Sequence, residues 1–323
     1  MKVLGMGNAL VDVLTLIDDD SLLQQLGLPK GSMQLIDEDR KNELSKIIED
    51  KNPYIASGGS ASNTIVGLAK LGVETGFIGR VGNDKFGSYY KEDLERSGVK
   101  SHLIVVDGEA SGVATAFVSK DGQRTFGTYL GAASKLTAGD LREEDFVGYD
   151  YFYIEGYLVQ NLGLIREAIS MAKKHGLKVI LDMASYNVVE SSRDFLLEIL
   201  PEYIDIVSAN EEEAKALLNV EPEKALGELA KMVEIAIVKV GADGSWVQRG
   251  EDKQFIPALK VNCVDTTGAG DLYASGFIYG LIHGFSLQKA GETGTLLAGN
   301  VIQVVGPKMD DGKWKELNSF IHP

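Results

Sequence analysis

The sequence predicts an α/β fold with a mostly parallel central sheet flanked by helices on both faces, because short β-branched runs alternate with amphipathic stretches. Buried parallel strands are typically continuous apolar runs, and the predicted strands have this character. They cover residues 3–6, 75–78, 151–154, 178–181, 204–207 and 235–240. The predicted helices cover residues 61–71, 86–97, 162–175, 211–218 and 223–232, and residues 271–304 form two more, separated at Gly284-Phe285-Ser286.

Three segments with alternating polar and apolar residues interrupt this order: 11–17, 113–119 and 124–129. The last two are joined by Lys120-Asp121-Gly122-Gln123, and Asp-Gly between such strands indicates a hairpin because both turn residues need positive φ. We expect a small separate β-sheet, a lid made of about residues 11–35 and 105–133, over the mouth of one domain spanning 1–323. The alternative is an extra hairpin at the edge of the main sheet.

The amino-acid composition argues against several classes of binding partner and metal site. A net charge of −15 argues against nucleic acid, whose phosphates need clustered Lys and Arg. Cys263 is the single cysteine, which excludes an intrachain disulfide and a cysteine-built zinc site. The N-terminus enters a predicted strand directly, without the features of a signal peptide, and no apolar run reaches membrane-spanning length. We therefore expect a cytoplasmic protein with no membrane partner.

The segment with the clearest chemistry is Asp265-Thr266-Thr267-Gly268-Ala269-Gly270-Asp271, directly before a predicted helix. The unhindered N–H groups of Gly268, Ala269 and Gly270, together with the helix dipole, suit an anion. A carboxylate at Asp271 can accept the proton of a hydroxyl that attacks a phosphorus held there. The alternative is that Asp271 caps the helix.

Three further segments carry polar groups at turns or helix starts. Gly58-Gly59-Ser60-Ala61-Ser62-Asn63 allows close backbone approach and offers an amide to a hydroxyl, or is a glycine turn before an ordinary helix. Asn210 and Glu213 share one helix face and can reach one hydrated cation, or Asn210 is a cap. Lys239-Val240-Gly241-Ala242-Asp243-Gly244 runs from a strand into a turn and is equally compatible with a plain Asp-Gly hairpin.

In their order along the chain (58–63, 210–213, 239–244 and 265–271), these four segments resemble the motifs of the ribokinase-like (PfkB) family of carbohydrate and nucleoside kinases, and the resemblance extends over nearly the whole chain. The resemblance implies Asp271 as catalytic base, Gly268, Ala269 and Gly270 as anion hole, and Gly58, Gly59 and Asn63 as substrate-binding residues. It implies ATP and Mg²⁺, with Glu213 contacting Mg²⁺ through water, and ATP contacts from Asn210, Lys239, Gly241, Gly244 and Asn300. Lys239 stands where the family usually has Thr, so an ionic phosphate contact replaces a hydroxyl contact. It also implies K⁺, held by Asp265, Thr267, Val301, Val304 and Gly306.

The start of the chain, Met6-Gly7-Asn8-Ala9-Leu10-Val11-Asp12, resembles the adenosine-kinase branch of this family, as do residues 18–38 and 128–134. Asn8 and Asp12 would then bind substrate, because a carboxylate suits the vicinal diol of a ribose; Asp12 is otherwise a polar residue at a strand end. We expect ATP-dependent phosphorylation of a 5′-OH-type hydroxymethyl group of a ribosyl compound, with a nucleoside such as adenosine as the favoured acceptor. The alternatives are a sugar kinase acting on ribose, fructose or a related sugar, and a ligand-binding regulator without turnover. An exposed lid sheet can also pair two subunits in a homodimer.

Overall fold

The computed structural model describes residues 1–120 and 123–321, and a nine-stranded sheet forms the centre of this part of the chain. Neighbours from β12 to β6 pair in parallel, whereas β13 and β14 add an antiparallel edge. The fold class predicted from the sequence is confirmed. In spatial order the strands are β14 (Asp252–Pro257), β13 (Gly244–Arg249), β12 (Ile235–Lys239), β11 (Ile206–Asn210), β10 (Lys178–Asp182), β9 (Tyr151–Glu155), β1 (Lys2–Met6), β5 (Glu74–Gly82) and β6 (Val99–Val106).

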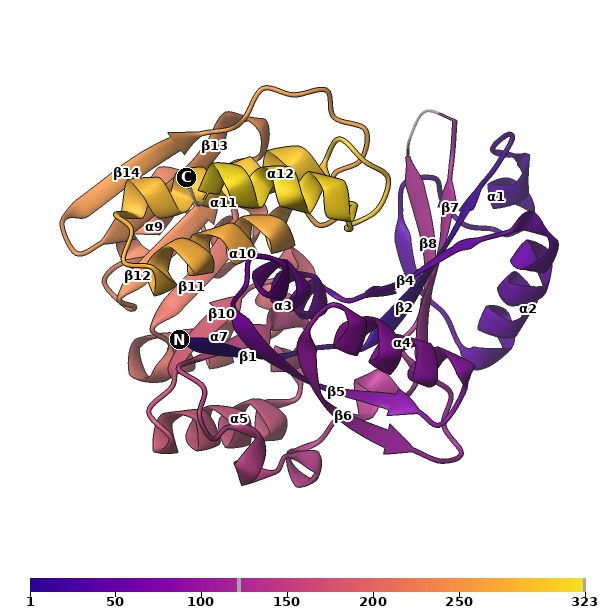
Figure 1. Cartoon of the computed structure of the whole chain (residues 1–323), viewed down its shortest axis with the longest axis horizontal. Helices are drawn as coiled ribbons and strands as arrows, with labels where there is room; N and C mark the ends of the chain where they lie inside the picture. The colour runs from indigo at the N-terminus through magenta and orange to yellow at the C-terminus, as the bar shows by residue number, and fades with distance from the viewer. Residues whose placement is uncertain (121–122, 322–323) are drawn as a thin grey trace.

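Helices cover both faces of this sheet (Figure 1). Successive residues of a strand point to opposite faces, so Val3 of β1 packs into one core and Leu4 into the other. The first core is covered by α3 (Ser60–Lys70), α4 (Lys85–Arg96), α10 (Ala269–Ile282), α11 (Leu287–Val301) and α12 (Asp311–Ile321). The second is covered by α5 (Leu162–Lys174), α6 (Tyr186–Ser191), α7 (Arg193–Tyr203), α8 (Glu211–Leu218) and α9 (Pro222–Leu229). Among the helices that the structure describes, none has the length and apolarity needed to cross a membrane.

The element boundaries show where sequence patterns mislead. The strand predicted at 204–207 is wrong at its start, because Ile204 still terminates α7 and β11 begins at Ile206. Helix α7 itself was not predicted, and Pro201 lies within its last turn. Proline usually ends a helical pattern, so the sequence signal there is weak.

The separate small sheet predicted from the alternating segments is present, with strand order β3-β8-β7-β2-β4. Its strands are β2 (Leu10–Leu16), β3 (Met33–Leu35), β4 (Tyr54–Gly58), β7 (Gly112–Val118) and β8 (Arg124–Tyr129). We call it the second sheet. The hairpin alternative at the edge of the main sheet is therefore excluded, while the predicted Asp121-Gly122 turn lies outside the described residues. Strand β4 falls between the two ranges predicted for the lid.

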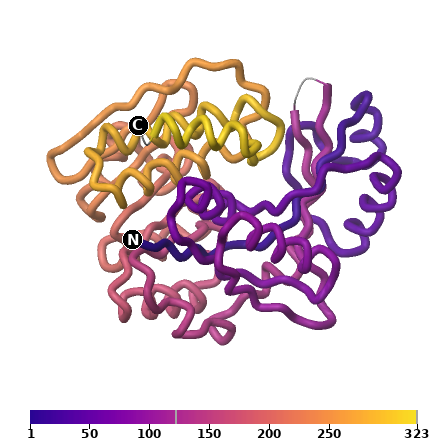
Figure 2. Tube along the Cα trace, in the orientation of Figure 1, coloured from indigo at the N-terminus to yellow at the C-terminus, as the bar shows by residue number. Residues whose placement is uncertain are grey.

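The two faces of the second sheet have different neighbours. Val13 and Phe117 point into a core shared with α1 (Ser21–Gln25) and α2 (Glu38–Ile48), which cover one face. The opposite face carries Asp12 and Arg124 and turns toward the main sheet, beside which the second sheet stands in Figures 1 and 2. A homodimer through this sheet stays a prediction, and α1 and α2 already occupy one of its faces.

Parallel strands end at one edge of the main sheet, and this edge collects polar side chains. Glu155, Asp182, Asn210 and Lys239 are the last residues of β9, β10, β11 and β12. In open α/β sheets, ligands bind outside these carboxyl ends. The second sheet and the start of α10 close the same region, so the fold gathers one site there.

A polar cluster at β6, the edge strand of the main sheet, leads to a stability prediction. Nδ1 of His102, a residue of β6, lies 2.6 Å from Oδ1 of Asp145. Nε2 of the same ring lies 2.9 Å from the Tyr149 hydroxyl oxygen. Burial lowers the pKa of His102 below its ordinary 6.5, so the folded state favours neutral imidazole. His102→Leu removes both contacts, so the Tyr149 hydroxyl loses this partner and the buried Asp145 keeps only Arg142. The free energy of unfolding in urea titrations should therefore fall by about 1–3 kcal/mol.

The same shift predicts a pH dependence with a definite sign. Because the folded pKa lies below the unfolded one, wild-type stability should fall as pH drops below 6.5, and His102→Leu should lack this component. The half-buried His175, replaced by Leu, serves as control and should change stability by no more than about 0.5 kcal/mol. Equal effects of the two variants would contradict a special role for His102.

Candidate active site

Asp271 lies in the first turn of α10, three residues after the N-cap Gly268. Its carboxylate accepts hydrogen bonds from the Ser60 hydroxyl at 2.7 Å and from the Asn63 amide at 2.9 Å. The oxygens are thus turned to α3 instead of capping α10. Burial raises the pKa of Asp271 to about 6, while the bonds from Asn63 and Ser60 oppose the rise. This carboxylate can accept a proton near neutral pH.

Close packing of α3 on α10 brings these three side chains together. Gly67 of α3 faces Ser275 of α10, and a Cβ on Gly67 would lie only 2.9 Å from the Ser275 Cβ. The Ser275 hydroxyl donates to the Thr64 carbonyl at 2.9 Å, and the Thr64 hydroxyl donates to the Asp271 carbonyl at 3.2 Å. Glycine at position 67 therefore sets the distance between Asn63 and Asp271.

The loop before α3 brings Asp12 to the same region. Gly59 has φ 93°, which side chains rarely adopt, and a Cβ there would collide with the Asn8 carbonyl. Gly58 lies directly against the carboxylate of Asp12, so any side chain at 58 would displace it. Burial raises the pKa of Asp12 to about 7; Arg124 and Lys308 lower it, and Asp271 raises it further. The structure therefore brings Asp12, Gly58, Gly59, Asn63 and Asp271 together, as the motifs predict.

Glu155 is a buried carboxylate that the motif analysis missed. Its Oε1 accepts from the Asn8 amide at 2.8 Å, and its Oε2 accepts from the Ala61 N–H at 3.1 Å. Burial raises its pKa to about 7. A sequence signal existed, since an acidic residue ends the apolar run 151–154. Glu155 joins the Asn8 turn to the start of α3.

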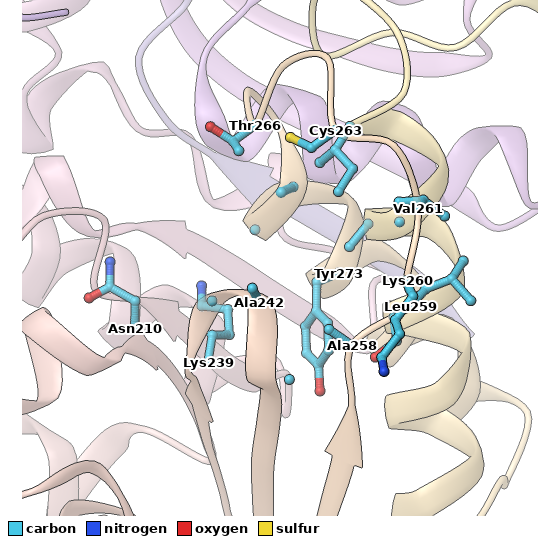
Figure 3. Close-up of a pocket in the computed structure, with 18 of the residues that line it drawn as sticks. Asn210, Lys239, Ala242, Ala258, Leu259, Lys260, Val261, Cys263, Thr266 and Tyr273 are labelled. Carbon is cyan, nitrogen blue, oxygen red and sulfur yellow. The ribbon is translucent and has the colours of Figure 1, made fainter.

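A cavity of about 870 Å³, drawn in Figure 3, lies against the first turn of α10 and is lined there by Ala269 and Gly270. Figure 3 shows Asn210 and Lys239 on one side of it and Leu259 and Lys260 on the other. The cavity is lined by Asn210, Lys239, Gly241, Ala242, Gly244, Ala258, Leu259, Lys260, Val261, Asn262, Cys263, Thr266, Ala269, Gly270, Tyr273, Thr295, Ala298, Gly299 and Ile302. Four of the five residues predicted to contact ATP are among them. The exception is Asn300, whose amide donates to the Leu296 carbonyl within α11.

Lys239 supplies a positive charge beside the predicted anion hole. Its Nζ donates to Asp182 Oδ2 at 3.0 Å, and a Cβ built on Gly270 would lie 3.4 Å from this nitrogen. Burial alone would lower the pKa of Lys239, but Asp182 and Glu213 raise it above its ordinary value. Lys239 therefore stays charged next to the N–H groups at the start of α10, which have no partner within the helix.

Asn210 and Glu213 form a reciprocal cap at the start of α8. The Asn210 side chain accepts from the Glu213 N–H at 2.8 Å, and Glu213 accepts from the Asn210 N–H and amide at 2.7 and 2.8 Å. Burial raises the pKa of Glu213 to about 7. The capping alternative is thus realised, and the Mg²⁺ role stays a prediction. Across residues 1–120 and 123–321, no group of three or more His, Cys, Asp or Glu side chains is arranged to hold a metal ion.

The predicted K⁺ loop is tied to the second sheet by Arg124, which the sequence analysis missed. Arg124 pairs with the Asp265 carboxylate and donates to the Thr267 hydroxyl at 3.0 Å. Asp265 also accepts from the N–H groups of Thr267 and Gly306 at 3.0 and 2.7 Å. The carbonyl of Val301, the last residue of α11, accepts from the Val304 N–H. The K⁺ role of these residues stays a prediction.

Comparison with known proteins matches this geometry to one family. Residues 31–311 match the family model described as pfkB family carbohydrate kinase. An adenosine kinase from Sinorhizobium meliloti superposes with a TM-score of 0.85 and 36% identity over 95% of each chain. A probable sugar kinase from Rhizobium etli gives 0.86 and 32% over 98% of each chain. The adenosine kinase of Schizophyllum commune is 28% identical, with 98% of each chain covered.

Cys263 offers a direct test of the large cavity, because it is exposed, lines the cavity and is the single cysteine. A maleimide should label one thiol per chain and block nucleotide binding. ATP at about ten times its Kd leaves the cavity open in only about a tenth of the molecules, so it should slow labelling about ten-fold. Cys263→Ser should escape labelling and keep its activity. Labelling at an unchanged rate under saturating ATP would place the nucleotide elsewhere.

Proposed function

The chain belongs to the pfkB family of carbohydrate kinases, and we propose that it phosphorylates the 5′-hydroxymethyl group of a nucleoside, with adenosine as the first candidate. The family assignment makes the protein a phosphotransferase, a nucleoside or sugar kinase that uses ATP, generally with Mg²⁺. What remains to be proposed is the acceptor and the role of each residue.

The observation that carries the nucleoside proposal is an apolar surface beside Asp12. Strand pairing places Ala56 and Ala114 next to Asp12, so small side chains leave room above its carboxylate. The neighbouring row across the second sheet consists of Tyr54, Leu14, Ala116, Phe126 and Met33. Four large apolar side chains on this face are each more than half exposed: Leu16, Met33, Leu35 and Tyr54. Exposed apolar patches commonly mark ligand grooves, and a purine covers such a surface whereas a free sugar does not.

Tyr157 supports the proposal from the main-sheet side. It follows Glu155 at the carboxyl end of β9 and is 37% exposed. Burial, together with the charges of Glu155, Glu213, Asp182 and Asp271, raises its pKa to about 12. We propose that the base of the nucleoside stacks on this ring.

In the proposed reaction, Asp12 accepts hydrogen bonds from the ribose diol, and Asn63 and Gly59 fix the ring. The 5′-hydroxyl lies against Asp271, which takes its proton as the oxygen attacks the γ-phosphorus. The bond from that phosphorus to the bridging oxygen breaks, and ADP departs. The N–H groups at 268–270, with Lys239 and Arg124, stabilise the charge on the transferred group. Mg²⁺, when bound, would neutralise phosphate charge, and Glu213 and Asp182, whose charges both act on Lys239, would hold the ion through water.

Asp271→Asn tests the base. The amide is isosteric, so fold and ATP binding should persist, while kcat should drop about 10²–10⁴-fold. In the wild type, kcat/KM should decrease as pH falls below about 6, because protonated Asp271 cannot accept a proton. Steady-state kinetics from pH 5 to 8 measure both effects. Activity within a few-fold of wild type in Asp271→Asn would exclude this base.

An acceptor panel tests the nucleoside proposal. At saturating Mg²⁺-ATP and fixed K⁺, adenosine should have a higher kcat/KM than inosine, guanosine, ribose or fructose. Base–aromatic stacking contributes about 1–3 kcal/mol, so Tyr157→Ala should raise the KM for adenosine by about ten-fold, with little change for ribose.

Tyr157→Phe, which keeps the ring, is the matched control and should retain the preference. A sugar that exceeds every nucleoside would overturn the acceptor proposal and favour the sugar-kinase alternative. If none of these acceptors supports ATP consumption, the result would favour the alternative of a ligand-binding regulator without turnover.

A further inference from the structure

The segment Gly306-Pro307-Lys308 connects the two halves of the active site. On the phosphate side, the Gly306 N–H donates to Asp265 Oδ2 at 2.7 Å. Pro307 packs on the anion hole, since a Cβ built on Gly268 would lie 2.8 Å from the Pro307 Cβ. The next residue, Lys308, extends to the acceptor side.

Lys308 ends in a buried polar cluster under the acceptor loop. Its Nζ donates to the Ser57 hydroxyl at 2.7 Å and to the Asp93 carboxylate of α4. The Ser57 hydroxyl donates to the same Asp93 oxygen at 2.6 Å. Burial alone would raise the pKa of Asp93, but the hydrogen bonds from Lys308 and Ser57 hold it below its ordinary value. Ser57 directly precedes Gly58 and Gly59, so this ion pair fixes the loop that presents the acceptor.

A second cavity, of about 450 Å³, opens beside this cluster and shares no lining residue with the large cavity. Its walls include Asn63, Lys70, Asp93, Arg96, Lys308 and Trp314. Each of its three cations is paired with a carboxylate: Lys70 with Asp311 at 2.8 Å, and Arg96 and Lys308 with Asp93. The cations of this cavity are therefore already neutralised by carboxylates. Because Lys308 lines the cavity, small solutes can reach it from there.

We propose that Lys308 is a positioning residue that fixes the acceptor loop at 57–59 relative to the anion hole at Gly268. Asp271 and the acceptor hydroxyl belong to opposite sides of this junction, so Lys308 sets the distance across which the proton and the phosphoryl group move. Misplacement of reacting groups by about 1 Å can cost about 10²-fold in rate. The inference rests on the proposed phosphoryl transfer, but it does not depend on which acceptor is used.

The test is Lys308→Ala, with kinetics on the acceptor that the wild type uses best. The kcat/KM for that acceptor should fall about 10- to 100-fold, while the ATP KM should stay within about two-fold, because that variant leaves the large cavity intact. Methylammonium should restore much of the loss by entering the second cavity and binding between Ser57 and Asp93. Lys308→Arg, which keeps the charge, should retain most of the activity.

Lys70→Ala is the matched control: Lys70 lines the same cavity and is also ion-paired, but it does not contact the acceptor loop. It should be near wild type and unaffected by methylammonium. If Lys308→Ala does not fold, Ser57→Ala should show a smaller loss of the same kind, confined to the acceptor. An ATP KM raised by more than about two-fold, no rescue in a folded Lys308→Ala, or unchanged kinetics would overturn the inference. A sugar as best acceptor would overturn only the nucleoside proposal.

Discussion

The contact between Asp271 and the start of α3 is the constraint on which the rest of the site depends. Asn63 and Asp271 are 208 residues apart in sequence, yet their side chains are 2.9 Å apart. This distance requires α3 and α10 to pack without an intervening side chain, which Gly67 permits. Because α10 begins at Gly268, the same packing places the carboxylate between the loop that precedes α3 and the free N–H groups at the start of α10.

Burial of charge determines the chemistry that this packing allows. The chain carries a net charge of −15, and the site itself contains several buried carboxylates. Burial raises the pKa values of Asp12, Glu155 and Asp271 into the range from about 6 to 7. Lys239 and Arg124 contribute the compensating positive charge at short range. An acidic protein can therefore bind a polyphosphate, because the local field at the anion hole differs from the global charge.

The second sheet contributes to both halves of the proposed reaction. Its face toward the main sheet carries Asp12, an apolar surface and Arg124, which pairs with Asp265. Helices α1 and α2 cover its other face, so the face that carries Asp12 is the one with exposed apolar side chains. In the proposed reaction, acceptor selection therefore depends on this one small sheet.

The sequence by itself determined the parallel α/β architecture, the separate small sheet and the glycine-rich segments around Asp271 and Gly59. These features are local, since hydrophobic periodicity and φ requirements act over a few neighbouring residues. Only the tertiary structure decided the partners of Glu155, Asp182, Arg124 and Lys308, which lie on different strands and loops. It also showed that Asn210 and Glu213 cap α8, and that Asp271 is turned to α3 instead of capping α10. Such pairings depend on which strand ends meet at the sheet edge, and no spacing within one segment encodes that.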